Sequence, residues 1–572
     1  CARALFPAVR AEIPLSTDTA ARPENTDGAR SLWGVFGSRA FTVILIASSI
    51  SNVGIAMFDT ASSWLMTSLN PDPMMVSAVQ VATTLPMFLL TLPAGVLTDI
   101  VDARRLIIGA QVAVLAISLV FTAIVALHLA APFTLLTTTF LLGAAGALAA
   151  PAWLLVTPML APTREDLDSV VAINNTSFNV SRAIGPALGG LAISAISIEI
   201  PFWCYCAGNL VLLAAVIWWR RPCRPKETLP AERFMSALKA GVRYVRHNRD
   251  IDSTLARAVA FYLFASAPWA LLPLVARVQM QNGAATYGVL LGMIGLGSIL
   301  GSLTLNWLKQ RLGPDRLAAL ATLGTVAALV LYGMAHGLIL AIAASLLTGA
   351  CWIVMMTTLF VSAQVALPDW VRGRGLAIYL SFYFGAMTAG SAIWGKVASV
   401  EGLSAAFFIA AAGAVMGLIV TWGRRLQTAA GLDLTPANHW RAPVFVQRVA
   451  DDQGPILVTV EYHIDPKDRA PFLATMREIG LERKRDGAYA WNVFDDAAGA
   501  GRMVEVFLVQ SLLELRRLRA RVTQADRAIE QEAQRYLKEP LKATFLVAPQ
   551  RSREKRRKLP KAVPAPAPSP AE

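Results

Sequence analysis

The stretch Leu85–Leu106, LPMFLLTLPAGVLTDIVDARRL, decides how this chain is built. Its first part is almost entirely apolar and continues an apolar run from residue 74. The run is therefore long enough to cross the ~30 Å hydrocarbon core of a bilayer as a helix. Gly95 is followed four residues later by Asp99, and the basic pair Arg104 and Arg105 comes next. An apolar segment of this length that ends in a short charged loop is typical of a membrane protein.

The rest of the chain repeats this pattern. Of the 572 residues, 55% are hydrophobic and only 16% are charged, whereas a soluble protein has about 25% charged residues. We therefore predict an all-α membrane protein of twelve transmembrane helices rather than a soluble enzyme. The spans are expected near 40–68, 74–98, 104–129, 132–158, 168–195, 200–220, 254–277, 284–308, 315–336, 338–366, 375–398 and 402–422.

The basic residues alternate with these spans, and this alternation predicts the orientation. Arg104 and Arg105 follow the second span, and the basic segment 221–253 follows the sixth. Lys309 and Arg311 follow the eighth span, and Arg372 and Arg374 follow the tenth. Positively charged loops remain in the cytoplasm, so both chain ends are expected there. The net charge of +14 thus reflects membrane topology, and no nucleic acid partner is expected.

The longest hydrophilic interruption divides the spans six and six. The expected organisation is a disordered cytoplasmic N-terminus (1–38), an N-terminal six-helix half (39–220), a cytoplasmic linker (221–253), a C-terminal half (254–425), a soluble domain (453–549) and a basic, Pro/Ala-rich tail (550–572).

The segment 453–549 has the pattern of an α+β domain. Residues 456–464 alternate between apolar and polar side chains, as a half-buried strand does. Helical and strand patterns then follow in the order βαββαβ, which predicts a ferredoxin-like fold. Adjacent strand residues point to opposite faces, so Trp491 and Asn492 cannot line one pocket. We expect a regulatory or dimerising module without enzymatic activity.

The loop after the second span resembles the cytoplasmic signature of the major facilitator superfamily. Gly95, Asp99, Arg104 and Arg105 supply its glycine, its aspartate and its basic pair. The resemblance implies a gate motif in which glycine permits close helix approach and the charges lock the two halves together. An ordinary positively charged loop is the alternative.

Two predicted spans carry polar side chains on one face. Asn175, Asn179 and Arg182 follow one another at steps of four and three on span 5, and Asn52 and Asp59 share a face of span 1. Charged residues inside a membrane usually serve function. Arg182 is expected about 20 Å along its span and Asp59 about 28 Å along its own, so the two charges are candidates for substrate binding and proton coupling. The alternatives are a structural ion pair for Arg182 and a wetted position near the outer surface for Asp59.

Span 5 ends in a glycine-proline motif, Gly185, Pro186, Gly189 and Gly190. The motif resembles the span 5 signature of exporters in the superfamily, although a plain packing motif would look the same.

Aromatic residues on spans 7 and 11 are candidates for lining a cavity. They are Trp269, Tyr379 and Tyr383. Most aromatic side chains in membrane spans face lipid or pack against helices instead.

Four stretches show a closer resemblance, to the enterobactin-exporter-like, or transmembrane secretion effector, branch of the superfamily. They are residues 51–69 (SNVGIAMFDTASSWLMTSL), 85–106, 178–190 (FNVSRAIGPALGG) and 372–390 (RGRGLAIYLSFYFGAMTAG). The resemblance covers roughly residues 35–548, because members of that branch often carry a similar appended cytoplasmic domain.

This resemblance implies a multi-pass transporter of the bacterial inner membrane that exports a small organic molecule by proton antiport. A siderophore-like compound, a drug and a metabolite all fit as substrate, and the expected partners are the substrate, protons, lipid and a second copy bound through the C-terminal domain. An importer or a non-transporting sensor homologue is the alternative. No P-loop and no Cys/His cluster with zinc spacing occurs in the sequence, so no catalytic residues, metal or cofactor are expected.

Overall fold

The computed structural model describes residues 32–161, 163, 166–219, 241–427, 433–437, 439–440, 450–497 and 501–549. The expectations for most of the N-terminal segment, for the linker up to residue 240 and for the tail 550–572 lie outside the described residues.

The N-terminal half consists of long helices that follow one another closely. They are α1 (Arg39–Leu69), α2 (Pro73–Ile100), α3 (Ala103–Ala126), α4 (Pro132–Val156), α5 (Leu167–Ala195) and α6 (Ile200–Trp218), with the short helices η1 (Leu32–Gly37) and η2 (Thr157–Leu160). Aspartates cap two of the starts, since Asp72 accepts from the Met74 amide and Asp102 accepts from the amides of Arg104 and Arg105. A carboxylate at a helix start satisfies amides that have no partner within the helix.

The C-terminal half has the same construction with more interruptions. Its elements are α8 (Arg249–Ala265), α9 (Ala267–Leu274), η3 (Val275–Gln279), α10 (Ala284–Gly333), α11 (Leu338–Val365), α12 (Asp369–Glu401) and α13 (Leu403–Thr421). Helix α10 covers two of the predicted spans and bends at Gly313, which has a φ of 70° and lies directly before Pro314. Only glycine adopts that backbone conformation without strain.

The number of membrane-length helices differs from the predicted twelve. Among the described residues, ten helices are long and apolar enough to cross a membrane. One difference arises because α10 joins two predicted spans into one helix. The other is α5, which is not among the ten because its polar face, including Asn175 and Arg182, lowers its hydropathy.

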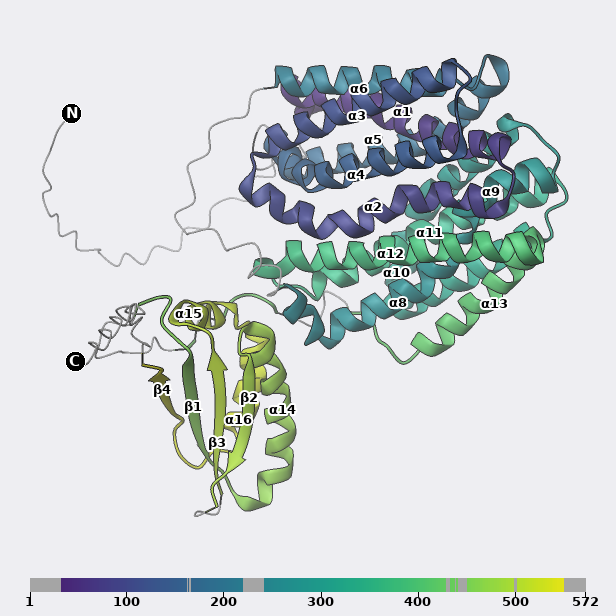
Figure 1. Ribbon diagram of the computed structural model, residues 1–572. Helices are drawn as coiled ribbons and strands as arrows, with labels where there is room; N and C mark the ends of the chain where they lie inside the picture. The colour runs from purple at the N-terminus through teal and green to yellow at the C-terminus, as the bar shows by residue number, and fades with distance from the viewer. Residues whose placement is uncertain are drawn as a thin grey trace, which may run out of the picture.

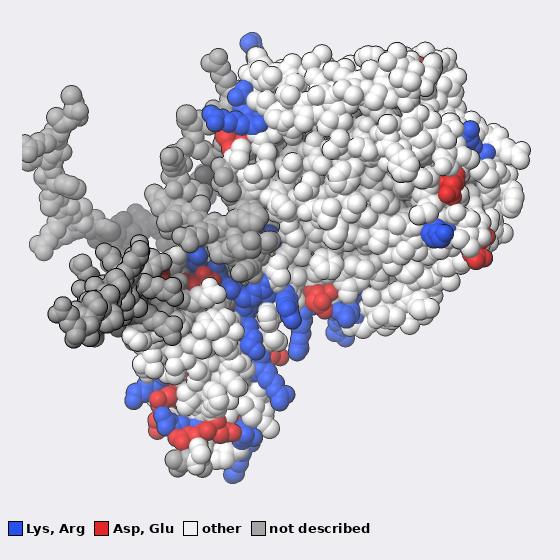
Figure 2. Space-filling view, viewed as in Figure 1, with Lys and Arg blue, Asp and Glu red and all other residues white. Residues whose placement is uncertain are grey.

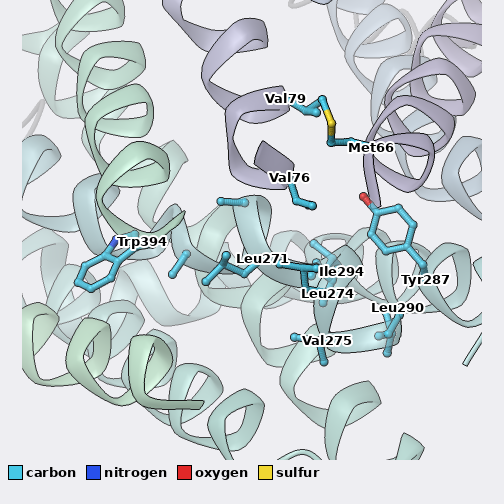
Figure 3. Close-up of a cluster of buried hydrophobic side chains, with 14 of the residues drawn as sticks. Met66, Val76, Val79, Leu271, Leu274, Val275, Tyr287, Leu290, Ile294 and Trp394 are labelled. Atoms are coloured by element: carbon cyan, nitrogen blue, oxygen red, sulfur yellow. The ribbon is translucent and has the colours of Figure 1, made fainter. Parts of the chain in front are cut away.

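The two halves share one hydrophobic core and each has another of its own. We call the end of the helices beside the C-terminal domain the domain-side end and the opposite end the far end (Figure 1). Near the far end, Met66, Val76 and Val79 of the first half belong to one buried cluster with Leu271 and Tyr287 of the second half (Figure 3). Toward the domain-side end, the cores separate into one within the N-terminal half and another formed almost entirely by the C-terminal half.

The C-terminal domain places three helices on one face of an antiparallel sheet. Its elements are β1 (Ile456–His463), η4 (Pro466–Asp468), α14 (Arg469–Asp486), β2 (Ala490–Asp495), β3 (Arg502–Val509), α15 (Leu512–Arg521), α16 (Gln524–Gln534) and β4 (Lys542–Val547), and the sheet order is β2-β3-β1-β4. The order of the elements along the chain agrees with the predicted order βαββαβ, except that the second helix is divided into α15 and α16. Thr523 begins α16 with a capping box formed with Asp526.

A buried ionic network joins the helices of this domain to its sheet. Arg483 of α14 lies 2.7 Å from a Glu530 carboxylate oxygen and 3.3 Å from a Glu505 oxygen. Its guanidinium also lies 4.4 Å from the ring centroid of Trp440, whose indole nitrogen donates to Glu530. His439 contacts Glu530 as well. The domain therefore includes residues that precede the predicted start at 453.

Candidate functional site

The two halves touch near the far end and part toward the domain-side end. On α5, a side-chain carbon at Gly190 would lie 2.7 Å from the Ala284 carbonyl oxygen of α10. The contact continues to Gly295, where such a carbon would lie 2.5 Å from the Cα atom of Ala183. On the domain side of Ala183, Phe178 of α5 and Trp307 of α10 are both exposed. The glycine contacts between the halves thus extend from the far end to Ala183, and toward the domain-side end the buried cores of the two halves are separate.

Helices α2 and α12 form a second contact between the halves. Gly395 lies against Ser77, the Thr84 and Thr388 hydroxyls are 2.8 Å apart, and Gly385 lies against Phe88. These pairs run in opposite directions along the two helices, so α2 and α12 are antiparallel neighbours.

Arg277 closes the far end. Its guanidinium donates to the hydroxyls of Thr67 at 2.9 Å and Ser68 at 2.6 Å, and lies 5.5 Å from the ring centroid of Trp64. Trp64 in turn stacks on Tyr287 of α10. Arg277 was not identified as a site residue from the sequence, because its partners come from the other half.

Arg182 lies at the point where the two halves diverge. It is one residue on the domain side of Ala183, and its side chain is exposed although it lies midway along α5. The guanidinium is 5.8 Å from the ring centroid of Trp269, which belongs to the other half, and 5.8 Å from that of Phe178. Cations are attracted to aromatic faces at this distance, so Arg182 links the two halves across their contact.

Trp269 belongs to a connected aromatic cluster in the C-terminal half. Its ring lies 5.1 Å from that of Trp352, which lies 5.4 Å from Tyr262; Tyr262 is 4.5 Å from Tyr383. The indole nitrogens of Trp269 and Trp352 are buried and have no hydrogen-bond partner among the described residues. Unsatisfied buried donors are rare in proteins. Trp269 is half-buried, so the cluster presents one aromatic ring beside Arg182.

One cavity candidate is placed differently from the expectation. Tyr379 is 2% exposed and packs in the hydrophobic core near Phe360, so it does not face an opening. Trp352 was not identified from the sequence, since it is one aromatic residue in a long apolar span.

Asp59 lies close to Arg182 but not in direct contact with it. Helices α1 and α5 cross where a side-chain carbon at Gly185 would lie 2.6 Å from the Ala56 Cβ atom. Arg182 precedes Gly185 by three residues and Asp59 follows Ala56 by three, so the two levels differ by about 9 Å along the helices. Asp59 is exposed and within electrostatic range of Arg182, and no ion pair of 4 Å or less joins the two described side chains.

The remaining polar candidates surround this crossing. Asn175 and Asn179 are exposed on the part of α5 that is free of α10, and Asn52 is half-buried on α1. Gly189 packs on Met57 of α1. Pro186 is buried, and its carbonyl oxygen faces α10 near Gly288. The glycine-proline motif thus packs α5 against both halves.

The gate motif makes different contacts from those expected. A side-chain carbon at Gly95 would meet no atom within 4 Å, so this glycine permits no close approach in the present conformation. Arg104 donates to the carbonyl oxygens of Val216 and Ile217, which end α6 in its own half. Arg105 is exposed. The side chain of Asp99 lies outside the described parts of the chain. Because the halves are parted at this end, the described motif residues contact only their own half.

Two halves of membrane-length helices with interior charges at their contact define the class of this protein, a transporter of the major facilitator type. Residues 30–551 match the transmembrane secretion effector family, and the chain belongs to that family. The chain is 27% identical over 345 residues to the enterobactin exporter EntS of Escherichia coli O1:K1 / APEC, an alignment that covers 59% of this chain and 79% of that protein. The same values hold for the EntS of Shigella boydii serotype 4 (strain Sb227). These homologues are transporters and not enzymes.

Solved structures share the fold. A mutant of the nucleoside transporter NupG aligns with a TM-score of 0.58 at 11% identity, over 68% of this chain and all of NupG. A POT family transporter in complex with 5-aminolevulinic acid aligns with a TM-score of 0.54 at 13% identity, over 67% of this chain and 95% of that one. Among the described residues, no group of three His, Cys, Asp or Glu side chains could hold a metal ion.

Proposed function

We propose that this protein exports a small organic molecule from the bacterial cytoplasm by proton antiport and alternating access. The observation that carries the proposal is the position of Arg182. A charged side chain midway along a membrane helix is costly unless it serves a ligand or a partner. Arg182 is exposed beside the contact between α5 and α10, and its guanidinium lies 5.8 Å from the ring centroid of Trp269 in the opposite half.

The charge distribution supports a cytoplasmic location for the domain-side end. On the face of the helical bundle that Figure 2 shows, charged side chains are almost confined to the two ends, and blue side chains are most numerous at the domain-side end and along the C-terminal domain. Positive loops remain in the cytoplasm. In this orientation the structure is open toward the cytoplasm and closed on the outer side, ready to accept a cytoplasmic substrate.

The site favours a negatively charged aromatic substrate. Arg182 supplies the positive charge, and the half-buried ring of Trp269 beside it supplies an aromatic face for stacking. A siderophore-like compound, a drug or a metabolite with these properties would fit. The similarity to an enterobactin exporter supports export over import.

Asp59 supplies the proton site in this proposal. Arg182 attracts both the Asp59 carboxylate and an anionic substrate, and about 9 Å along the helices separates the two charges. Substrate bound at Arg182 would withdraw that attraction and favour protonation of Asp59. Proton and substrate would thus compete for one arginine, which couples their movements in opposite directions.

Transport into everted membrane vesicles tests the proposal. Aromatic carboxylates, with neutral and cationic analogues of the same ring, would be presented with and without an imposed proton gradient. We expect gradient-dependent accumulation of the anionic compounds only. Accumulation in right-side-out vesicles alone would favour import, and no transport in either would favour the sensor homologue.

A second role concerns the uncovered face of the C-terminal sheet. The helices cover one face, while the other exposes Phe494 and Leu546 at 52% each beside the half-buried Val506 and Leu508. We propose that this apolar face pairs with a second copy of the chain. Light scattering of the purified protein should report a dimer, and Phe494→Lys should yield monomers; a monomeric native protein would exclude the pairing.

A further inference from the structure

The C-terminal domain is attached to the helical bundle through three arginines. Arg243, in the helical residues 241–246 of the linker, lies 3.2 Å from a Glu514 carboxylate oxygen of α15. Arg521 of α15 lies 4.4 Å from the ring centroid of Trp370, at the start of α12. Arg485 of α14 lies 5.4 Å from the Tyr244 ring. An ion pair and two cation–π contacts thus hold the domain against the bundle.

The bundle side of this contact is a packed surface. Tyr244 is 1% exposed and meets Trp370 edge-on at 5.6 Å. Its hydroxyl donates to the Ala366 carbonyl oxygen, which also accepts from the Asn248 side chain. Burial is the largest single influence and raises the pKa of Glu514, but Arg521, Arg243 and Arg517 together outweigh it and leave that pKa below its ordinary value. Glu514 is therefore a carboxylate at neutral pH, and the ion pair is charged.

The same end of α12 lies opposite the gate motif. The antiparallel register between α2 and α12, continued to the domain-side end, brings Asp99 of α2 level with Arg374 of α12. A side-chain carbon at Gly241 in the linker would lie 3.1 Å from the Arg374 Cβ atom. The domain, the linker and the first turns of α12 thus form a continuous series of neighbours, and the gate motif on α2 lies level with those turns.

We infer that the C-terminal domain regulates the gate. While it is docked on Arg243, Tyr244 and Trp370, it holds the linker and the start of α12 in the arrangement that accompanies the parted domain-side end. Release of the domain lets that end close. This inference rests on the proposed function only in that transport requires both conformations.

Two distances measured by spin labelling separate docking from gating. Labels at Glu478 and Gln310 report the distance between domain and bundle, and labels at Asp168 and Gln310 report the opening between α5 and α10. All three positions are exposed in the structure. The measurements use the full chain in lipid nanodiscs, with the five cysteines replaced by serine.

Arg243→Glu and Trp370→Leu should each broaden the distribution of the docking distance, between the labels at Glu478 and Gln310. Each should also shorten the opening distance, between the labels at Asp168 and Gln310. Arg246→Glu, an exposed arginine on the same linker helix, should change neither. Because ordinary couplings between sites change a conformational ratio by about tenfold, we expect a shift of that size between open and closed populations. An unchanged docking distance in both variants would overturn the interface. A broadened docking distance with an unchanged opening distance would overturn the regulation.

A crosslink tests the case in which the domain cannot leave the helical bundle. Cysteines at positions 243 and 514, joined by a short bis-maleimide, should fix the domain in place and hold the opening distance long. Transport should then fall to background in the crosslinked protein, while the same protein without crosslinker, in which the domain is free to leave, transports above background. Full transport by the crosslinked protein would overturn the inference and leave the proposed function intact. Absence of transport in the wild type would instead count against the proposed function, and both distances would still test the regulation.

Discussion

Arg182 of α5 and Asp59 of α1 lie on opposite sides of one helix crossing, separated by about 9 Å along the helix axes. The Gly185–Ala56 contact lies between their levels. The two side chains are near enough to influence each other electrostatically and too far apart for an ion pair at rest. This spacing suits two sites that exchange occupants better than a permanent structural pair.

Asp59→Asn should abolish transport driven by a proton gradient and leave substrate binding measurable. The amide has nearly the shape of the carboxylate but cannot take up a proton. Binding would be followed by quenching of tryptophan fluorescence, since Trp269 and Trp352 lie near the proposed site. Gradient-driven transport that survives in this variant would exclude Asp59 as the proton site.

Arg182→Lys should weaken binding of an anionic aromatic substrate less than Arg182→Ala does. Lysine keeps the charge but loses the planar guanidinium that lies near Trp269 and Phe178. The alanine variant loses a charge-assisted contact, which corresponds to roughly a tenfold or greater rise in Kd. Equal binding by both variants and the wild type would assign Arg182 to structure instead of substrate.

Gly190→Ala should open the outer side of the protein. Its new methyl group would lie 2.7 Å from the Ala284 carbonyl oxygen, so the contact between α5 and α10 cannot close fully. A cysteine at position 67, which is buried in the structure, should then react with an impermeant maleimide added to cells. Gly283→Ala is the matched control, because a carbon at Gly283 meets no atom within 4 Å. Equal labelling in the two variants would contradict the closed outer side.

A fragment of residues 433–549 should fold on its own and be more stable than 453–549. The shorter fragment lacks Trp440 and His439, which contact Arg483 and Glu530 in the buried ionic network. The loss of one buried cation–π contact and of the hydrogen bonds that Trp440 and His439 make with Glu530 should cost about 3 kcal/mol of unfolding free energy. Urea denaturation followed by circular dichroism measures the difference. Equal stability would remove these residues from the domain.

Glu482→Gln should stabilise the same fragment at high pH. Both carboxylate oxygens of Glu482 are buried without a hydrogen-bond partner among the described residues. Burial raises the pKa of Glu482 well above its ordinary value of 4.5, and Asp526 and Glu530 add to the rise while Arg483 and Arg485 oppose it.

The sign of this effect follows from the raised pKa. The protonated form is favoured in the fold, so its contribution is complete below pH 4.5 and is lost as the pH rises through the folded-state pKa. The unfolding free energy of the native fragment should therefore fall with rising pH, and Glu482→Gln should remove that slope. Glu478→Gln, at an exposed position one turn away, is the control. Identical slopes in both variants would show that Glu482 is not the group responsible.

What could be predicted from the sequence depended on local geometry. The rise per residue of a helix predicted that Arg182 and Asp59 lie within two helical turns of each other in membrane depth. In the structure, their levels along the helices differ by about 9 Å. Alternation of apolar residues likewise predicted the strand Ile456–His463. The division of the predicted spans into two halves of six placed Arg182 and Trp269 in different halves. It did not predict that the two side chains are in contact.

Contacts between distant segments were not predictable. The Arg182–Trp269 contact, the Arg243–Glu514 ion pair and the position of Arg277 depend on how large bodies are oriented relative to one another. A single sequence contains no periodicity that reports such orientations. The gate motif shows the same limit, because the sequence predicted contacts across the halves and the described contacts of Arg104 lie within its own half.

The hydrophobic core shared by the two halves has a thermodynamic consequence. To open the outer side, Met66, Val76 and Val79 must separate from Leu271 and Tyr287 (Figure 3), and water must reach that apolar surface. Exposing apolar surface to water raises the heat capacity. In the proposed cycle, closing the domain-side end would bury apolar residues that are now exposed there, such as Phe178 and Trp307, and would lower the heat capacity. The two changes offset each other, so a nearly straight van 't Hoff plot is expected for the equilibrium between the two conformations, although large apolar areas exchange between water and protein in every cycle.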